Sequence, residues 1–214
     1  MLDRNYHGLL LGLIVKNHRQ PQYCNYSTDT EYSIEYVNGV AYIAFAGSEH
    51  WRDWLINLWV FGNSQGKVKV HAGFAYAYKC LKEHLYEKLF ELPTIEKLCV
   101  GGYSQGGAIA QICARDLQRL GFNVRCLSLG SPPVGNMEYD RTCEFEHHRI
   151  YNHFDPVPRS LANWLVGFNH YQTTSDELRF LSPNPHDLGG YIKAKNQSLN
   201  KSKVKSQKSK AKSK

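Results

Sequence analysis

The chain lacks any long hydrophobic run. A membrane-spanning helix requires about eighteen consecutive apolar residues, and no stretch of the sequence approaches that length. The nearest candidate is the apolar segment 8–15. Asp3 lies before it, Lys16 follows it directly, and no small-residue cleavage site is present, so we interpret it as a first helix that packs on the core. We therefore expect no transmembrane segment, and a protein that is cytoplasmic or otherwise without a cleavable signal peptide.

Metal-binding patterns are missing as well. The six cysteines show neither a Cys-x-x-Cys pair nor zinc-site spacing, and the ten histidines include no His-Glu-x-x-His motif. Cys99 and Cys126 lie in apolar, strand-like segments and Cys113 lies in a helical one, which suits buried reduced thiols. We therefore expect no metal, no cofactor and a reducing environment.

Acidic residues are absent from residues 193–214, which contain nine lysines. The formal charge of +7 belongs to this segment, because residues 1–192 carry 17 basic and 19 acidic side chains. A segment so rich in lysine and serine cannot bury enough apolar surface to fold. The sequence predicts one domain over residues 1–192 and a disordered basic tail over residues 193–214. The tail could contact an anionic membrane surface, attract nucleic acid or only aid solubility; of the two partners, we expect the membrane and not nucleic acid.

Glycine, serine and short apolar segments occur in an informative order around Ser104. Residues 97–101 have the pattern of a buried strand, Gly-Tyr-Ser-Gln-Gly follows over residues 102–106, and residues 107–114 have helical apolar spacing. A Gly-x-Ser-x-Gly motif between a strand and a helix describes a nucleophile elbow, a sharp turn that raises a serine hydroxyl above a sheet. The sequence predicts Ser104 as a nucleophile; the alternative is an ordinary glycine-rich turn.

The rest of the domain predicts an α/β fold. Asn38-Gly39 separates two strand-like runs, residues 31–36 and 40–45, which is a strong hairpin signal. Further strands then alternate with helices, including a helix over about residues 73–91 and a polar helix near residues 138–145. This order predicts an α/β-hydrolase-like architecture: a mainly parallel sheet, an N-terminal antiparallel hairpin, and helices on both faces.

A serine nucleophile needs a histidine base and a carboxylate that orients the base. Asp155 lies just after the strand-like residues 149–152, and Pro156 holds its backbone extended. His186 lies in a proline-rich loop before the last helix, and we favour it as the base over His170. The alternative for Asp155 is a turn aspartate without a catalytic role.

Hydrogen-bond donors for the oxyanion of the transition state are the remaining requirement. The backbone N–H of Gln105, directly after the nucleophile, is one candidate. The other is Ser48, which follows Gly47 at the end of the second hairpin strand and could offer its N–H and its hydroxyl. Ser48 is equally suited to cap the helix that follows, and the two roles are compatible.

At this point the residues resemble the class 3 (fungal-type) lipase family. The resemblance is carried, in the family's order, by Phe45-Ala46-Gly47-Ser48, Asp53-Trp54 with Asn57, Val70-His71-Ala72-Gly73-Phe74, the Gly102–Gly107 elbow, residues 130–136, and residues 152–158. It implies an α/β-hydrolase fold, a triad of Ser104, Asp155 and His186, an oxyanion hole of Ser48 and Gln105, and a lid after Ser48. Tyr103 and Gln105 depart from the common His and Leu of the elbow.

Large apolar side chains recur at helical spacing after Ser48, and they are Trp51, Trp54, Leu55, Leu58 and Trp59. One interpretation places them in the core. The other makes them a lid whose apolar face covers the acyl site and opens onto lipid. Trp164, between the predicted acid and base, could line the acyl groove or belong to ordinary packing.

These observations predict a serine carboxylic-ester hydrolase, most simply a lipase that cleaves acylglycerol-type lipid esters through an acyl-enzyme. Two alternatives stay open. One is an esterase or phospholipase acting on short-chain or polar esters. The other is an inactive hydrolase fold that binds a membrane or nucleic acid through its basic tail.

Overall fold

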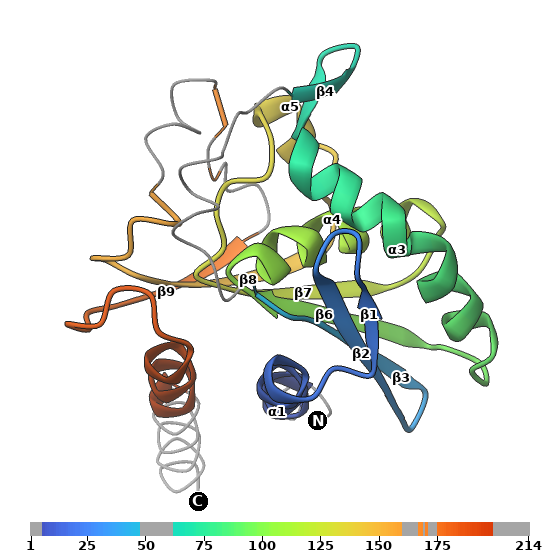
Figure 1. Cartoon of the computed structure of the whole chain (residues 1–214), viewed down its shortest axis with the longest axis horizontal. Coiled ribbons are helices and arrows are strands. Elements are labelled where there is room, and N and C mark those ends of the chain that lie inside the picture. Colours follow the sequence, from blue (N-terminus) through green and yellow to red (C-terminus); the bar gives the residue numbers. More distant parts are fainter. Residues whose placement is uncertain (1–5, 48–61, 160–166, 169, 171–174, 199–214) are drawn as a thin grey trace, which may run out of the picture.

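The computed structural model describes residues 6–47, 62–159, 167–168, 170 and 175–198. In this part of the chain a seven-stranded sheet crosses the molecule in the order β1-β2-β3-β6-β7-β8-β9 (Figure 1). Its first three strands form an antiparallel meander of β1 (Tyr23–Asn25), β2 (Thr30–Val37) and β3 (Val40–Phe45). The predicted hairpin is present, and β1 is an additional edge strand.

The hairpin turn explains why Asn-Gly stands between β2 and β3. Asn38 and Gly39 both have positive φ, 49° and 80°, and Val37 pairs with Val40. A two-residue turn of this kind needs left-handed backbone at both positions, which asparagine and glycine adopt most readily. The local sequence therefore determines the register of the two strands.

The other strands run parallel to β3, and they are β6 (Lys97–Tyr103), β7 (Val124–Leu129), β8 (Glu146–Asn152) and β9 (Ser175–Phe180). Leu98 to Tyr103 are all buried, as expected for a central strand with helices on both faces. The carboxyl ends of these strands meet at one edge, where ligands of open α/β sheets bind.

Helices cover both faces of the sheet (Figure 1). The helix α1 (Tyr6–Arg19) and the helix over residues 188–198 lie on one face. On the other face α4 (Gln105–Arg119) packs directly against β6 and β7, and α3 (Ala72–Phe90) packs against α4. The chain is therefore a three-layer α/β structure with one apolar core on each side of the sheet.

The two cores are separate sets of fully buried side chains. Under α4 and α3 they include Phe45, Phe74, Leu85, Leu98 and Ile109. Under α1 and the 188–198 helix they include Leu10, Leu13, Ile14, Leu127 and Tyr191. Apolar segment 8–15 thus lies in a helix packed on the core, as its sequence pattern predicts.

The polar helix expected near residues 138–145 is much shorter than predicted. The helix α5 (Met137–Asp140) is a single turn, after which the Cys143 amide donates to the Asp140 carbonyl at 2.9 Å. Cys143 and Phe145 are both buried whereas Glu144 between them is exposed, which is the alternation of an extended chain. Packing of these two side chains in the core ends the helix.

A small two-stranded sheet, β4 (Gly62–Gln65) and β5 (Val68–His71), precedes α3.

The C-terminal helix extends beyond the predicted domain boundary. We expected a disordered tail from residue 193, but residues 193–198 continue the helix that begins at residue 188. Tyr191 and Lys195, four positions apart, lie on one buried helix face, with Lys195 only 7% exposed. A lysine can bury its aliphatic stem in this way while its ammonium group reaches polar surroundings. Residues 199–214 lie outside the described residues.

All six cysteines are free thiols, and Cys99, Cys113, Cys126 and Cys143 are buried. Burial raises the pKa of Cys99 to about 12, so this thiol is protonated and unreactive at neutral pH. Within the described ranges, every helix is either too short or too polar to cross a bilayer.

Candidate active site

Ser104 occupies the sharp turn between β6 and α4. Its backbone has φ 54° and ψ −123°, a conformation that residues other than glycine rarely adopt. The Ser104 amide donates to the Leu129 carbonyl on the neighbouring strand at 2.9 Å, and its carbonyl accepts from Gly107 at 3.0 Å. The sheet and the first turn of α4 therefore hold the strained residue in place, as in a nucleophile elbow.

Two glycines of the motif are required by close backbone contacts. A Cβ on Gly102 would lie 2.3 Å from the carbonyl carbon of Gly106. A Cβ on Gly106 would lie 2.3 Å from the Ala46 carbonyl oxygen. Because nonbonded carbons and oxygens cannot approach so closely, only glycine lets α4 start directly against β6 and the end of β3.

The structure brings Ser104, His186 and Asp155 into one hydrogen-bonded chain. His186 Nε2 lies 2.8 Å from Ser104 Oγ, although the two residues are 82 positions apart in sequence. His186 Nδ1 lies 2.6 Å from Asp155 Oδ2. The Asp155 side chain is fully buried and that of His186 is 1% exposed. This geometry suits a serine hydroxyl that loses its proton to an imidazole held by a carboxylate.

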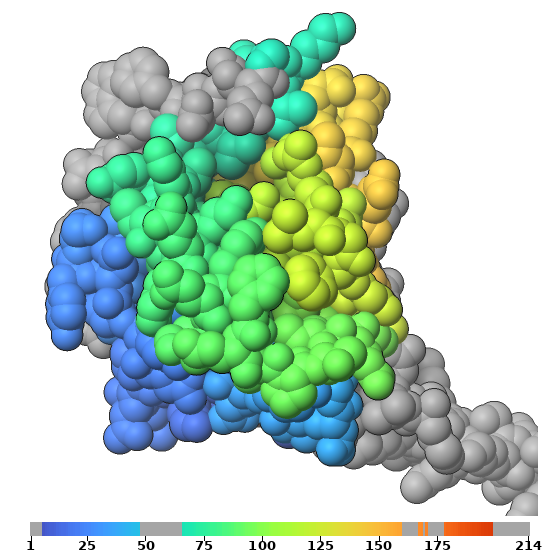
Figure 2. All heavy atoms as spheres, turned by 90° about the vertical axis from the view of Figure 1, so that its right-hand side faces the viewer, coloured from blue at the N-terminus to red at the C-terminus, as the bar shows by residue number. Residues whose placement is uncertain are grey.

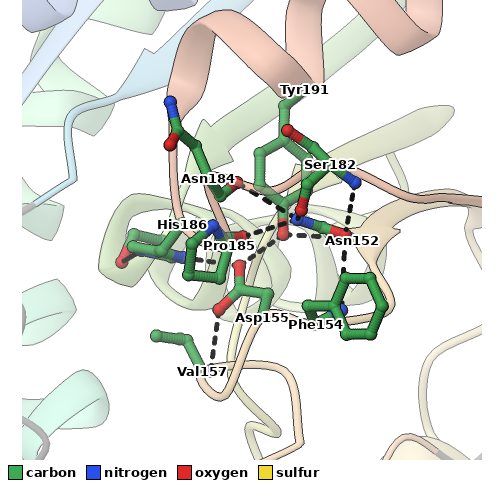
Figure 3. Close-up of polar contacts among 10 residues, drawn as sticks. Asn152, Phe154, Asp155, Val157, Ser182, Asn184, Pro185, His186 and Tyr191 are labelled. Atoms are coloured by element: carbon green, nitrogen blue, oxygen red, sulfur yellow. Dashed lines mark hydrogen bonds and ion pairs between the residues drawn. The ribbon is translucent and has the colours of Figure 1, made fainter.

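The Asp155 carboxylate has donors on both of its oxygens. Oδ1 accepts from the Val157 amide at 2.8 Å, and Oδ2 also accepts a hydrogen bond from the Tyr191 hydroxyl (Figure 3). Tyr191 is fully buried, and its hydroxyl also accepts from the Asn152 amide at 3.1 Å. A buried carboxyl group would be costly without hydrogen-bond partners, and these donors supply them to both of its oxygens.

A second aromatic residue, Tyr103, covers one face of the His186 imidazole. The two ring centroids are 4.9 Å apart and the planes are inclined by 26°. Tyr103 is the residue before the serine, so the elbow itself delivers this ring. The stacking restricts rotation of the imidazole away from Ser104.

Asn152 connects the loop that holds the acid to the loop that holds the base (Figure 3). Its side-chain NH2 lies within 3.1 to 3.2 Å of three carbonyl oxygens, those of Ser182, Asn184 and Pro185. Its Oδ1 accepts from the amides of Phe154 and Ser182. Asn152 is fully buried at the end of β8, so this amide fixes the His186 loop relative to Asp155.

The sequence assigned no role to Tyr103, Asn152 or Tyr191. Their positions offer a partial signal, because Tyr103 is inside the elbow motif and Asn152 ends a strand three residues before Asp155. Tyr191 offers less, since its contact with Asp155 spans 36 positions.

Of the two predicted oxyanion donors, Gln105 is among the described residues and Ser48 is not. Gln105 is the first residue of α4, so its amide N–H has no intrahelical acceptor and is free to bind an anion. Ser48 lies outside the described residues. Its neighbour Gly47 reaches the elbow, because a Cβ on Gly47 would lie 3.2 Å from Ser104 Cβ. The predicted lid and acyl-pocket residues also lie outside the described residues: Trp51, Trp54, Leu55, Leu58, Trp59 and Trp164.

Other histidines near the site have different surroundings. Burial, followed by the nearby charge of Arg149, lowers the pKa of His170 well below its ordinary value, so this imidazole stays neutral. His153 contacts the Arg179 guanidinium. His147 Nε2 lies 2.8 Å from Ser128 Oγ inside the sheet. Between the two candidates for the base, it is His186 that contacts Ser104 and Asp155.

No group of three or more His, Cys, Asp or Glu side chains in the described part of the chain is arranged to hold a metal ion. The protein groups brought together at the site are a hydroxyl, an imidazole, a carboxylate and the first amide of α4.

Comparison with known families gives a direct match. The family model of class 3 lipases matches residues 42–164, which is more than half of the chain. The chain belongs to the class 3 lipase family. Among curated members, the secreted mono- and diacylglycerol lipase A of Penicillium cyclopium is 28% identical over 162 residues, or 71% of this chain and 52% of that protein. A lipase of Rhizomucor miehei is 32% identical over 143 residues, or 60% of this chain and 39% of that protein.

Solved structures place this class 3 lipase chain in the α/β-hydrolase fold. A triacylglyceride lipase of Rhizomucor miehei aligns with a TM-score of 0.63 and 27% identity over 72% of this chain and 63% of that one. A lipase of Rhizopus microsporus aligns with a TM-score of 0.68 and 22% identity, over 85% and 74%. The chain spans about half the length of the curated relatives it matches.

Proposed function

We propose that this class 3 lipase chain is a serine carboxylic-ester hydrolase that cleaves acylglycerol-type lipid esters. The observation that carries the proposal is the continuous contact from Ser104 Oγ through the His186 ring to Asp155, at 2.8 and 2.6 Å. Relatives named as mono- and diacylglycerol lipases support an acylglycerol as the substrate.

In the acylation step, Ser104 Oγ attacks the ester carbonyl carbon while His186 Nε2 takes its proton. Asp155 accepts the hydrogen bond from Nδ1–H, which fixes the tautomer and stabilises the imidazolium that forms. The Gln105 amide donates to the oxyanion, with Ser48 as the proposed second donor. Loss of one such donor typically costs about 2.7–4 kcal/mol of transition-state stabilisation.

The tetrahedral intermediate then breaks down. The imidazolium donates its proton to the leaving alkoxide, which departs as an alcohol and leaves the acyl group on Ser104. A water molecule gives a proton to His186 and attacks the acyl-enzyme. The carboxylic acid leaves, and Ser104 recovers its proton from His186.

Labelling with a fluorophosphonate probe tests the nucleophile. We expect covalent labelling of the wild type and none of the Ser104→Ala variant, because the probe reacts with an activated serine. Ser128→Ala is the matched control, since Ser128 also contacts a histidine but lies buried within the sheet. Wild-type protein that fails to label would contradict the proposal and favour an inactive hydrolase fold. Labelling that survives Ser104→Ala would contradict the assignment of Ser104 as the nucleophile.

A substrate panel tests the ester class. We expect hydrolysis of emulsified mono- or diacylglycerols to exceed hydrolysis of soluble short-chain p-nitrophenyl esters. Activity confined to the short esters, with Ser104-dependent labelling intact, would retain the mechanism and replace the lipase assignment with an esterase. Activity confined to phospholipid esters would replace it with a phospholipase.

A further inference from the structure

A second concave site lies between α3 and α4, away from the triad. Figure 2 shows the face of the molecule on which these two helices reach the surface beside each other. The cavity has a volume of about 250 Å³. Arg115 in its wall lies roughly 15 Å along α4 from the elbow, at about 1.5 Å per residue. The cleft is therefore separate from the catalytic site.

Positive charge gathers in this cleft. The charged side chains that line it are Lys79 and Lys82 of α3, and Arg115, Asp116 and Arg119 of α4. Residues 1–192 contain 17 basic and 19 acidic side chains, so the domain as a whole is not basic. The four cations around one carboxylate leave three positive charges uncompensated, and this concentration is a local property of the cleft.

The carboxylate that the described residues contribute to the cleft lining, Asp116, already accepts three hydrogen bonds on one of its oxygens. Asp116 Oδ2 accepts from Lys82 Nζ at 2.6 Å, from the Tyr86 hydroxyl at 2.9 Å and from the Tyr78 hydroxyl at 3.1 Å. Burial by itself would raise the pKa of Asp116, but the Lys82 and Tyr86 hydrogen bonds outweigh it and the pKa is lowered. Asp116 therefore stays ionised, and its single charge offsets one of the four positive charges of the cleft, that of the Lys82 ammonium with which it pairs.

The other cations of the cleft have no carboxylate partner among the residues that the structure describes. Lys79, Arg115 and Arg119 form no ion pair within the described ranges. Arg115 is nevertheless held in position: its guanidinium lies 5.0 Å from the Tyr139 ring centroid, and its Nε donates to Thr142 Oγ1 at 2.5 Å. Its two terminal amino groups have no hydrogen-bond partner in the described structure, so they can donate to a ligand.

We propose that this cleft binds a phosphomonoester dianion, either on a small soluble molecule or as the head group of a lipid such as phosphatidic acid. A guanidinium with two available amino groups matches two phosphate oxygens, and the neighbouring Lys79 and Arg119 supply further charge. A dianion compensates the excess charge better than a carboxylate does. The cavity volume of about 250 Å³ exceeds that of a phosphate group, so the cavity also has room for an organic group against Val68, Val70 and Ile112.

Titration with glycerol 3-phosphate at constant ionic strength tests the site in the full chain. We expect amide chemical-shift changes in the backbone of residues 75–82 and 112–119. Arg115→Gln is expected to weaken binding roughly tenfold or more, because it removes charge-assisted hydrogen bonds. The double variant Lys79→Gln/Arg119→Gln should weaken it similarly, and these two exposed residues can change without disturbing the fold.

Lys88→Gln is the matched control on the same helix. Lys88 pairs with Glu91 and does not line the cleft, so its loss should leave the dissociation constant unchanged. The proposal is overturned if wild-type protein shows no saturable binding at millimolar ligand. It is also overturned if the cleft variants bind as tightly as the wild type, if Lys88→Gln weakens binding as much as they do, or if decanoate binds more tightly than the phosphate ester.

Vesicles distinguish the two sources of the phosphate group. Co-sedimentation with phosphatidic acid vesicles that falls in the cleft variants, relative to Lys88→Gln, identifies a lipid head group. Equal co-sedimentation of all variants, together with cleft-dependent glycerol 3-phosphate binding, identifies a soluble phosphate ester. Neither readout involves ester hydrolysis, so the result is independent of the proposed catalytic function.

Discussion

At the residue scale, the candidate site depends on side chains that hold the histidine rather than react. Tyr103 stacks on His186, and Tyr191 donates to the Asp155 oxygen that His186 also contacts. Both tyrosines are buried, which raises the pKa of each far above the usual value through desolvation and the neighbouring Asp155 charge. They therefore act as neutral hydroxyl-bearing rings throughout the working pH range.

Replacement of Tyr103 tests the stacking. We expect Tyr103→Leu to lower kcat about threefold to tenfold with little change in KM, because an aromatic pair contributes about 0.5–1.5 kcal/mol. Tyr103→Phe keeps the ring and should retain nearly full kcat. The measurement is steady-state hydrolysis of a soluble ester by the three proteins. Equal kcat values for the Leu and Phe variants would contradict a role for the ring.

At the element scale, the ends of β6 and β8 and the loop before the last helix converge on one edge of the sheet. Parallel pairing of β6, β7 and β8 brings the carboxyl ends of the strands together, so Ser104 and Asp155 are neighbours by topology. His186 belongs to an irregular loop, and it is the Asn152 amide that fixes this loop on the end of β8.

Asn152→Asp tests this connection between the loops. The substitution replaces the buried NH2 donor with an oxygen that faces three carbonyl oxygens. We expect a loss of about 3 kcal/mol or more in the free energy of unfolding, since each buried unsatisfied or repelling polar group costs about 1–3 kcal/mol. Urea denaturation measures the loss. Asn184→Asp is the control, because Asn184 is exposed and contributes only its backbone carbonyl.

At the scale of the whole molecule, several histidines are buried as neutral imidazoles. Desolvation lowers the pKa of His7 to about 3, that of His147 to about 3 and that of His71 to about 4. In the unfolded chain each histidine titrates near 6.5. The unfolded state therefore binds more protons than the folded state between about pH 6.5 and 4, and stability is lost as the pH falls through this window.

We expect the free energy of unfolding to fall by up to about 4 kcal/mol per pH unit near pH 5, if all three histidines take up a proton on unfolding. The measurement is urea denaturation at a series of pH values from 7.5 to 4.5. His147→Gln should flatten the slope by about 1.4 kcal/mol per pH unit. A stability that does not change over this range would contradict the buried neutral state of these residues.

The basic segment of residues 199–214 belongs to the same scale. Seven lysines lie in residues 199–214, and each lysine near an anionic membrane contributes about 1 kcal/mol of attraction. We propose that this segment promotes contact with anionic membranes. Deletion of residues 199–214, or replacement of its lysines with glutamine, should reduce co-sedimentation with phosphatidylserine vesicles by roughly tenfold or more at low salt. Unchanged binding across salt concentrations would eliminate this role.

Features that depend on short stretches of chain can be predicted from the amino-acid sequence alone. Asn38-Gly39 specifies a turn with positive φ at both residues, and the apolar runs of β6 and β7 specify buried strands. Gly102 and Gly106 around Ser104 specify the elbow, because only residues without a Cβ allow its close contacts. The class of fold and the nucleophile candidate follow from these local patterns.

Features that depend on contacts between distant segments can be read only from the folded chain. Contact between Ser104 and His186 spans 82 positions, and no periodicity in the sequence distinguishes His186 from His170 as the base. Contacts with other elements likewise explain three further features. They are the hydrogen bonds of the Asn152 side chain to the His186 loop, the end of α5 at Asp140 and the helical conformation of residues 193–198. Helical and strand patterns record only which face of an element is buried, whereas the partner on that face is selected by the arrangement of the whole chain.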